Sequence, residues 1–425
     1  MAAELVNFRP GALRGSVAVP GDKSISHRAL IAGAAGTAPL RIANLNAGRD
    51  VRATYEALIA LGVHVRTDGD DAVVSGGRLL SRATTIDCMN SGSTARMLLG
   101  ACAGANAAAR FDGDSSLRRR PMEPVAAQLR AFGAKIETTD GRLPLQLLGT
   151  PEIQTRHFIL LSPSAQVKSA LLFAGIFAGV AVAVDGDRGS RDHTERLLAY
   201  LGAEIEWGGS SIRLNRSRLA GGSVTVAGDV SAAAFFVTAA AITPGSSIRI
   251  PGVGVNPTRT GLFDVLRSMG AAIELENERA AYGEPVADVT VEYRPLIAAN
   301  VDAGTALRAI DEIPLIAVAA AFAEGTTTIA GISDLRSKES DRIDAIERLL
   351  EAVGVESSYD RGALRVIGGA PVPRKPAVRT EHDHRIAMAA AVLACAAGPL
   401  TVDGSASVEV SFPGFVSALA ALQAP

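Results

Sequence analysis

Cationic and hydroxyl side chains recur in short segments that precede apolar or amphipathic stretches of this 425-residue chain. A helix N-terminus offers free N–H groups and the positive end of the helix dipole, and both favour an anion. Lysine adds charge, and arginine adds a planar fork that fits phosphate or carboxylate. The pattern therefore predicts a substrate with more than one anionic group. The segments are GDKSISHR at 21–28, NSGSTAR at 90–96, RRRP at 118–121, SPSAQVKS at 162–169, SRDH at 190–193 and RSKESDR at 336–342.

Each of these residues alone also has an ordinary structural interpretation. Ser, Thr, Asn and Asp often cap helix N-termini, a run of arginines is typical of a solvated loop, and Asp311 is placed to cap a helix containing Pro314. Capping does not explain why paired cations recur in a chain whose net charge is −2. Only five of the 42 basic residues are lysines, so a lysine inside a motif is harder to explain as surface filler.

Other chemistries find less support in the sequence. His382 and His384 could ligate a metal, but no third His or Cys cluster accompanies them. His384 with Arg385 could instead begin a helix that contacts an anion. The chain has no P-loop and no G-x-S-x-G elbow, and the Gly252–Gly254 pair of glycines is too short for a dinucleotide fingerprint. We expect no metal and no cofactor.

The composition is that of a soluble globular protein of several domains, with 48% hydrophobic and 20% charged residues. A nucleic-acid-binding protein would need a basic excess that this chain lacks. Three cysteines without C-x-x-C spacing fit a reducing compartment. The sequence shows neither a secretory signal nor an unbroken apolar stretch long enough to span a membrane. We therefore expect a cytoplasmic protein that binds neither nucleic acid nor membrane.

One phrase recurs about every seventy residues: an amphipathic stretch, an apolar residue, a glycine, a small residue and often Ile or Val. Each glycine predicts a helix C-terminus followed by a strand. Upstream of each amphipathic helix lies an almost wholly apolar helix, which must be buried. Six such helix pairs, grouped as three plus three, predict an α/β (α+β) fold of two similar domains with a seam near Gly228. The glycines are Gly62, Gly133, Gly202, Gly270 and, in a weaker copy, Gly354.

Ten motifs, in this order, resemble those of the 5-enolpyruvylshikimate-3-phosphate (EPSP) synthase family. The resemblance implies two domains, each of three β-α-β-α-β-β units, in the architecture called an inside-out α/β barrel. The domains would comprise residues 21–227 and residues 1–20 with 228–425, with the active site in the cleft between them. The motifs are GDKSISHRAL, NSGSTARMLL, GDSSLRRRPM, SPSAQVKSALLFAG, SRDHTE, GDVSAAAFF, IDEIP, LRSKESDRI, DHRIAM and SFPGF.

The resemblance implies transfer of the enolpyruvyl group of phosphoenolpyruvate to the 5-hydroxyl of shikimate 3-phosphate, with release of phosphate, on the pathway to chorismate and aromatic amino acids. Asp311 matches the family's general base for the hydroxyl. Glu339, with Lys23, matches the proton carrier for the methylene carbon. Contacts to shikimate 3-phosphate are implied for Lys23, Ser24, Arg28, Ser164, Ala165, Gln166, Ser190, Arg191, Asp311 and Lys338.

The same resemblance implies a phosphoenolpyruvate pocket, which in this family is also the glyphosate pocket. A side chain at Gly92 would crowd it. Ser93 keeps the hydroxyl of the threonine found in many relatives, whereas Val410 replaces a lysine of some relatives and removes one contact. Contacts to phosphoenolpyruvate are implied for Lys23, Asn90, Gly92, Ser93, Arg120, Gln166, Arg342, His384 and Arg385.

Two alternatives remain beside this interpretation. The sister family uses UDP-N-acetylglucosamine as acceptor, opens with a Lys-Asn pair and commonly has a cysteine in its mobile loop. This chain has Lys23-Ser24 and Ser115 at those places. A non-catalytic polyanion binder would use the arginine-rich helix starts, but the neutral charge, few aromatics and scattered basic residues disfavour it. A monomer is the usual form of the EPSP synthase family.

Overall fold

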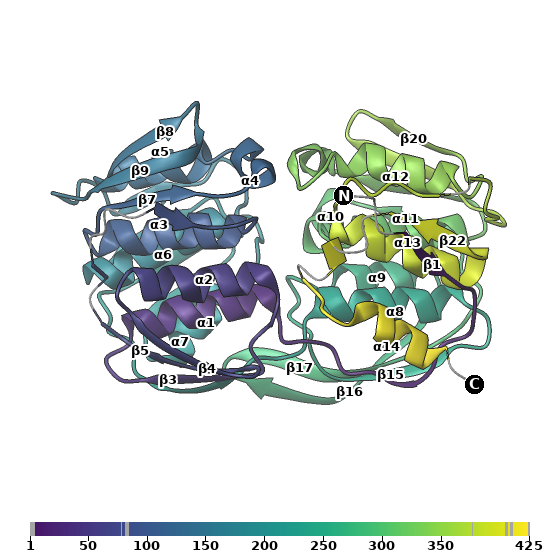
Figure 1. The fold of residues 1–425 in the computed structure, drawn as a ribbon, viewed down its shortest axis with the longest axis horizontal. Coiled ribbons are helices and arrows are strands. Elements are labelled where there is room, and N and C mark those ends of the chain that lie inside the picture. The colour runs from purple at the N-terminus through teal and green to yellow at the C-terminus, as the bar shows by residue number, and fades with distance from the viewer. Residues whose placement is uncertain are drawn as a thin grey trace. The chain divides into compact units, whose positions relative to one another are not determined.

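The computed structural model describes residues 5–77, 79–80, 85–375, 377–403, 407–408 and 411–423, so Val410 lies outside the described residues. Contacts between residues divide the chain into two compact units (Figure 1). Unit 2 comprises Gly21–Val226 with Ala280–Glu284. Unit 1 comprises Met1–Pro20, Ala227–Arg279 and Pro285–Pro425, so it is assembled from three separate stretches of the chain.

Unit 2 contains three four-stranded sheets of one topology. In each sheet the first two strands are parallel, and the third and fourth form an antiparallel hairpin with the third strand beside the second. The orders are β14(Gly222–Thr225)-β3(Leu40–Ala43)-β5(Asp71–Ser75)-β4(His64–Asp68), then β6(Thr85–Asp87)-β7(Ala109–Asp112)-β9(Arg142–Gly149)-β8(Lys135–Thr139), and β10(His157–Ile159)-β11(Val182–Asp185)-β13(Ser211–Leu214)-β12(Ile205–Gly208).

Unit 1 repeats this topology twice and ends in a smaller sheet. The tip of its first hairpin, Ala280–Glu284, groups with unit 2, where Glu284 Oε1 lies 2.7 Å from His193 Nδ1. The sequence did not predict that this hairpin tip belongs to unit 2. The described strands form separate open sheets rather than one closed ring. The orders are β2(Arg14–Ser16)-β15(Ser247–Gly254)-β17(Glu284–Glu292)-β16(Ala272–Ala281), then β18(Asn300–Val301)-β19(Thr326–Ala330)-β21(Ala363–Ile367)-β20(Ser357–Asp360), and the antiparallel pair β1(Val6–Phe8)-β22(Leu400–Val402).

The helices fall into the two predicted kinds, which confirms the α/β fold of repeated units. Apolar helices form the interior, and all thirteen residues of α8 are buried. They are α1(Lys23–Ala35), α3(Gly92–Gly104), α6(Ala165–Ala178), α8(Val230–Ile242), α11(Ile313–Ala321) and α13(His384–Ala397). The amphipathic helices are α2(Arg49–Ala60), α5(Glu123–Phe132), α7(His193–Tyr200), α9(Gly261–Ser268), α12(Arg342–Glu351) and α14(Phe415–Leu422). Shorter elements are α4(Ser115–Arg119), α10(Ala303–Arg308) and the 3₁₀ helix η1(Ser333–Ser337). In the described part of the chain, no helix is long and apolar enough to cross a membrane.

The recurring glycines end their helices as predicted. All five have a positive φ, between 74° at Gly354 and 118° at Gly133. This left-handed conformation is strained for residues with a Cβ and lets the chain turn from the helix into the next strand. The repeat in the sequence is therefore a repeat of helix ends.

Helices α3 and α6 approach closely because small residues line their interface. A Cβ at Gly100 would lie 2.1 Å from the carbonyl oxygen of Ala170, and one at Gly104 would lie 2.2 Å from that of Ala174. Both contacts are with backbone atoms, so only separation of the helices relieves them. The N-termini of these two helices carry several of the predicted binding residues.

We expect Gly100→Ala to lower the free energy of unfolding by about 1–3 kcal/mol, the usual cost of overpacking a core. Urea unfolding monitored by circular dichroism measures this difference. Gly208→Ala is the matched control, because Gly208 is exposed and nothing lies within 4 Å of its Cβ position. Equal stability of the two variants would contradict the close helix packing.

Candidate active site

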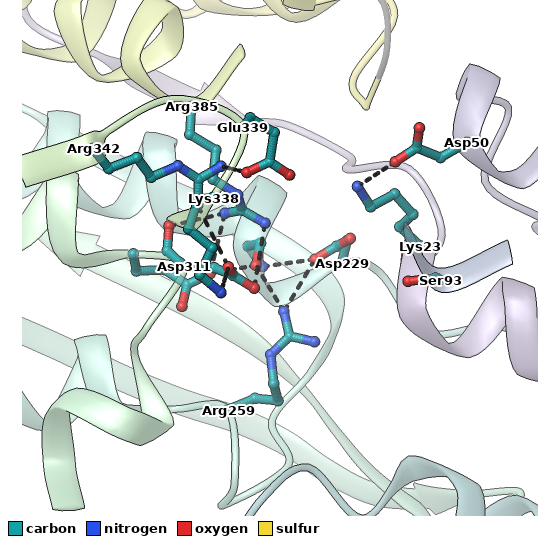
Figure 2. A network of polar contacts seen from close by, with 12 residues as sticks. Lys23, Asp50, Ser93, Asp229, Arg259, Asp311, Lys338, Glu339, Arg342 and Arg385 are labelled. Atoms are coloured by element: carbon teal, nitrogen blue, oxygen red, sulfur yellow. Dashed lines mark hydrogen bonds and ion pairs between the residues drawn. The ribbon is translucent and has the colours of Figure 1, made fainter. Parts of the chain in front are cut away.

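Asp311 lies at the centre of a polar cluster in unit 1 (Figure 2). Helix α11 begins at Ile313 with Glu312 as its N-cap residue, so the interpretation of Asp311 as the N-cap was wrong. Pro314 in the first helical turn forces no loss of a hydrogen bond, because first-turn N–H groups have no partner inside the helix. Asp311 thus stands just before the helix, and its side chain is 16% exposed.

Three cations from three elements surround the Asp311 carboxylate. Lys338 follows η1, and its Nζ lies 3.9 Å from Oδ1. Arg342 begins α12, and its Nη1 lies 3.6 Å from the same oxygen. Arg385, the second residue of α13, places Nη2 3.7 Å from Oδ2 and donates from Nη1 to the Asp311 carbonyl oxygen at 3.1 Å. The sequence predicted all four residues as site residues, and the structure brings them together.

Arg342 is fully buried and is held by two further carboxylates. Its Nε donates to Asp383 Oδ2 at 2.8 Å, and its Nη2 donates to Glu339 Oε2 at 2.6 Å. Burial lowers the pKa of Arg342, but Asp383, Glu339 and Asp311 outweigh it and the pKa is raised. Burial likewise raises the pKa of Asp383, but Arg342 outweighs it and the pKa is lowered. Arg342 Nη1 is buried without a hydrogen-bond partner among the described residues, so it can donate to a ligand.

A second set of buried groups in unit 1 was missed by the sequence analysis. Glu312 accepts a hydrogen bond from Ser231 Oγ, and its Oε1 lies 3.5 Å from Arg385 Nη1. Arg259 Nη2 also donates to Ser231 Oγ, at 2.7 Å, and lies 3.7 Å from Asp229 Oδ1. The motifs IDEIP and GDVSAAAFF contain Glu312, Asp229 and Ser231, but only the fold shows that these motifs meet.

The cluster as a whole is not an excess of positive charge. Three cations contact four carboxylates, which are Asp311, Glu312, Glu339 and Asp383. The carboxylates therefore offset the charge of these cations, and among the described residues Arg342 Nη1 is a donor that stays open to an anionic ligand.

Lys23 begins the first helix of unit 2. Asp22 caps α1 by accepting from Ile25 N, which is the ordinary capping role considered for this segment. Lys23 Nζ donates to Asp50 Oδ2 at 2.9 Å, as Figure 2 shows. Asp50 lies in the first turn of α2, and no motif in the sequence pointed to it. Both side chains are largely buried, at 19% and 13% exposed, so the pair fixes the ammonium.

The start of α3 is joined to the arginine run. Arg120 follows α4, and its Nη2 donates to Asn90 Oδ1 at 2.5 Å, while Asn90 Nδ2 donates to Asp114 Oδ2 at 2.7 Å. Asn90 thus fixes the position of the Arg120 guanidinium. The loop interpretation of the arginine run was wrong for Arg118, which is helical and pairs with Asp112.

Gln166 bridges the starts of α6 and α3. It accepts from Arg96 Nη1 at 2.7 Å and donates to Ser93 Oγ at 3.1 Å. Arg96 ends the NSGSTAR motif, and its contact with Gln166 has no signal in the sequence. A Cβ at Gly92 would lie 2.5 Å from Arg96 Nη1 and 3.6 Å from Arg120 Nη1.

The resemblance to the EPSP synthase family implies that phosphoenolpyruvate binds beside Gly92. We therefore expect Gly92→Ala to raise KM for phosphoenolpyruvate by about tenfold, or about 1.4 kcal/mol, because the methyl group displaces Arg96. Steady-state rates at saturating shikimate 3-phosphate measure this change. The KM for shikimate 3-phosphate should stay within about twofold. Equal changes in both KM values would contradict a local effect at Gly92.

The remaining predicted residues of unit 2 gather around α6 and the start of α7. Ser164 caps α6 by accepting from Val167 N at 3.4 Å, and Ala165 is the first residue of that helix. Arg28 is buried and donates to Ser24 O, Ser169 Oγ and Thr194 Oγ1 at 2.7–3.1 Å. Ser190 is buried, and Arg191 beside it is half-buried.

His384 begins α13, as the anion-contact interpretation predicted, and Asp383 caps this helix by accepting from Arg385 N at 2.9 Å. His382 precedes the helix with a φ of 61°. Among the residues that the structure describes, no group of three or more His, Cys, Asp or Glu side chains is arranged to hold a metal ion.

Comparison with known proteins places this chain in a family. A family model described as EPSP synthase (3-phosphoshikimate 1-carboxyvinyltransferase) matches residues 9–419. The 3-phosphoshikimate 1-carboxyvinyltransferase of Anaeromyxobacter sp. (strain K) is 44% identical over 422 residues, which cover 98% of this chain and 96% of the relative. The protein of the same name from Thermus thermophilus is 43% identical over 411 residues, 95% of each chain.

Solved structures agree with the sequence relatives. The enolpyruvyl transferase NikO from Streptomyces tendae superimposes with a TM-score of 0.76 at 22% identity, covering 100% of this chain and 98% of that one. The fold is therefore that of an enolpyruvyl transferase. The EPSP synthase from Acinetobacter baumannii superimposes with a TM-score of 0.88 at 35% identity, covering 99% and 98%. The chain belongs to the EPSP synthase family.

Proposed function

We propose that the polar residues gathered in the two units carry the reaction of the EPSP synthase family. That reaction transfers the enolpyruvyl group of phosphoenolpyruvate to the 5-hydroxyl of shikimate 3-phosphate and releases phosphate, and family membership assigns it to this chain. The product lies on the pathway to chorismate and the aromatic amino acids. The observation that carries the residue assignments is the Asp311 carboxylate, which lies within 3.9 Å of Lys338, Arg342 and Arg385.

Asp311 is the general base of the first stage. It accepts the proton of the 5-hydroxyl as that oxygen attacks C2 of phosphoenolpyruvate. The methylene carbon takes up a proton at the same stage from Glu339 or Lys23, and a tetrahedral ketal results. In the second stage the new methyl group loses a proton, the bond from C2 to the phosphate oxygen breaks, and inorganic phosphate leaves.

Phosphoenolpyruvate binds through cations that its phosphate and carboxylate can pair with. Arg342 offers the buried Nη1 that has no hydrogen-bond partner among the described residues, and Arg385 offers a fork held by Asp311 and Glu312. In unit 2 the contacts are Lys23, Arg120, Gln166 and the α3 start at Gly92 and Ser93. Asn90 positions Arg120, and His384 contributes the N-terminus of α13.

Shikimate 3-phosphate binds through hydroxyl, amide and cationic groups. Its phosphate lies at the N-terminus of α6, where Ser164, Ala165 and Gln166 stand, and against Ser190 and Arg191. The Ser190 Oγ atom is buried with no hydrogen-bond partner in the described chain, which supports a ligand contact. Lys23, Ser24, Arg28 and Lys338 complete the set, with Asp311 at the reacting hydroxyl. We also propose a cytoplasmic monomer, on family membership.

Phosphate release from phosphoenolpyruvate tests this function. The chain is assayed with shikimate 3-phosphate and, separately, with UDP-N-acetylglucosamine, each with and without a chelator. We expect release with shikimate 3-phosphate alone, unchanged by the chelator. Phosphate release with UDP-N-acetylglucosamine would favour the activity of the sister family. If folded protein released no phosphate with either acceptor, the proposal would be overturned.

A further inference from the structure

Lys168 is a fully buried lysine to which the reaction above gives no role. It is the fourth residue of α6, and its side chain is 1% exposed. The rest of this helix is almost wholly apolar and buried, and lysine is scarce in the chain as a whole. An ammonium in such surroundings persists only where charged and hydrogen-bonding partners replace its water.

Three acceptors surround the Lys168 ammonium, which has three N–H groups. Nζ donates to Asp187 Oδ2 at 2.7 Å and to the carbonyl oxygen of Ser190 at 3.1 Å. It also lies 2.7 Å from Glu195 Oε1. Glu195 is as buried as the lysine, and burial raises the pKa of Glu195 against the opposing attraction of Lys168.

These contacts join the two segments that we propose to hold the phosphate of shikimate 3-phosphate. One turn of α6 separates Lys168 from Ser164, and Lys168 N donates to the Ser164 carbonyl oxygen at 3.0 Å. On the other side, Asp187 Oδ1 accepts from Ser190 N at 3.3 Å. Lys168 therefore holds the Ser190 carbonyl oxygen, and Asp187 holds the Ser190 N–H.

These backbone contacts leave the Ser190 hydroxyl able to bind a ligand. Its Oγ is buried and has no hydrogen-bond partner within the described residues. A buried hydroxyl without a partner is costly unless a ligand completes its hydrogen bonds. Its place beside the α6 N-terminus gives that ligand the chemistry of an anion.

We propose that Lys168 is a positioning residue for shikimate 3-phosphate, which through Asp187 and the Ser190 carbonyl fixes the Ser190 hydroxyl relative to the N-terminus of α6. This inference rests on the proposed function. Lys168 touches no substrate itself. We expect Lys168 to affect the binding of the phosphate of shikimate 3-phosphate and to have little effect on the chemical step at Asp311.

The test is Lys168→Met, which keeps the length of the side chain and removes the charge. Each KM is measured at saturating concentration of the other substrate. We expect KM for shikimate 3-phosphate to rise about tenfold or more, with KM for phosphoenolpyruvate within about twofold and kcat within about threefold of wild type. A merely structural lysine would lower the melting temperature and the amount of active enzyme while leaving both KM values unchanged, and that result overturns the proposal.

Two further variants keep the test decisive. Asp187→Asn retains the shape and an acceptor for Ser190 N, and it should raise the same KM in the same direction even if Lys168→Met does not fold. Lys135→Met, at the exposed start of β8, is the matched control and should change neither KM. Equal rises in both KM values for Asp187→Asn would also overturn the proposal. Wild-type enzyme that releases no phosphate with shikimate 3-phosphate would instead refute the proposed function.

Discussion

Asp311→Asn is expected to lower kcat by roughly 10²- to 10⁴-fold, the usual contribution of a general base. The amide has the size of the carboxylate but cannot take the proton of the 5-hydroxyl. Binding should survive, because the substitution removes a negative charge that lies within 3.9 Å of Lys338, Arg342 and Arg385. The affinity for the anionic phosphoenolpyruvate should therefore stay the same or increase.

Steady-state kinetics and calorimetric titration of both substrates separate these effects. Asp334→Asn is the matched control, because Asp334 is exposed on η1 and should change neither rate nor affinity. An Asp311→Asn variant that turns over normally would remove Asp311 from the role of base. A variant that loses both substrates would show that Asp311 acts by holding the site together.

Arg342→Met is expected to lower the free energy of unfolding at pH 7 by about 3–5 kcal/mol and to abolish turnover. The guanidinium neutralises Asp383 and Glu339, and its loss leaves Asp383 buried without that charge. Arg348→Met is the control on the same helix. Its surface pairs with Asp344 and Glu381 should contribute only about 0–1 kcal/mol each.

The pH dependence of this loss has a defined sign. In the wild type the pKa of Asp383 is lowered, so its contribution is present above the unfolded pKa of about 4 and is lost as pH falls through the folded value. Without Arg342, the burial that raises the pKa of Asp383 dominates, so the variant is stabilised as pH falls and the carboxyl group binds a proton. The difference in melting temperature should therefore shrink between pH 7 and about pH 4. A difference that widens toward acid would contradict the ionic account.

The repeated part of the fold could be predicted because it depends on local signals. The five glycines mark helix ends because each adopts a positive φ. The apolar composition of helices such as α8 is itself sufficient to predict that they are buried. Strand partners depend on where distant segments meet. The pairing of β14 with β3, whose residues are about 180 positions apart, has no signal in either segment.

The same division holds within the site. Asp311, Arg342 and Arg385 could be named from motifs that each carry a recognisable residue pattern. Asp50 and Glu312 could not, because their role comes from the partner that the fold brings to them. Arg96 and Gln166 are 70 residues apart and meet only because α3 and α6 pack against each other. The sequence predicted an anion site from recurring cations, whereas the structure shows that Lys338, Arg342 and Arg385 also contact carboxylates.

The most direct test of the central claim follows the carbon that is transferred. Phosphoenolpyruvate labelled with ¹³C at C2 is incubated with shikimate 3-phosphate and the enzyme, and the product is examined by NMR. The account predicts an enol ether carbon that is coupled through oxygen to the ring hydrogen at C5, together with one phosphate released per product. Label found in pyruvate, or coupled to another ring hydrogen, would contradict transfer to the 5-hydroxyl.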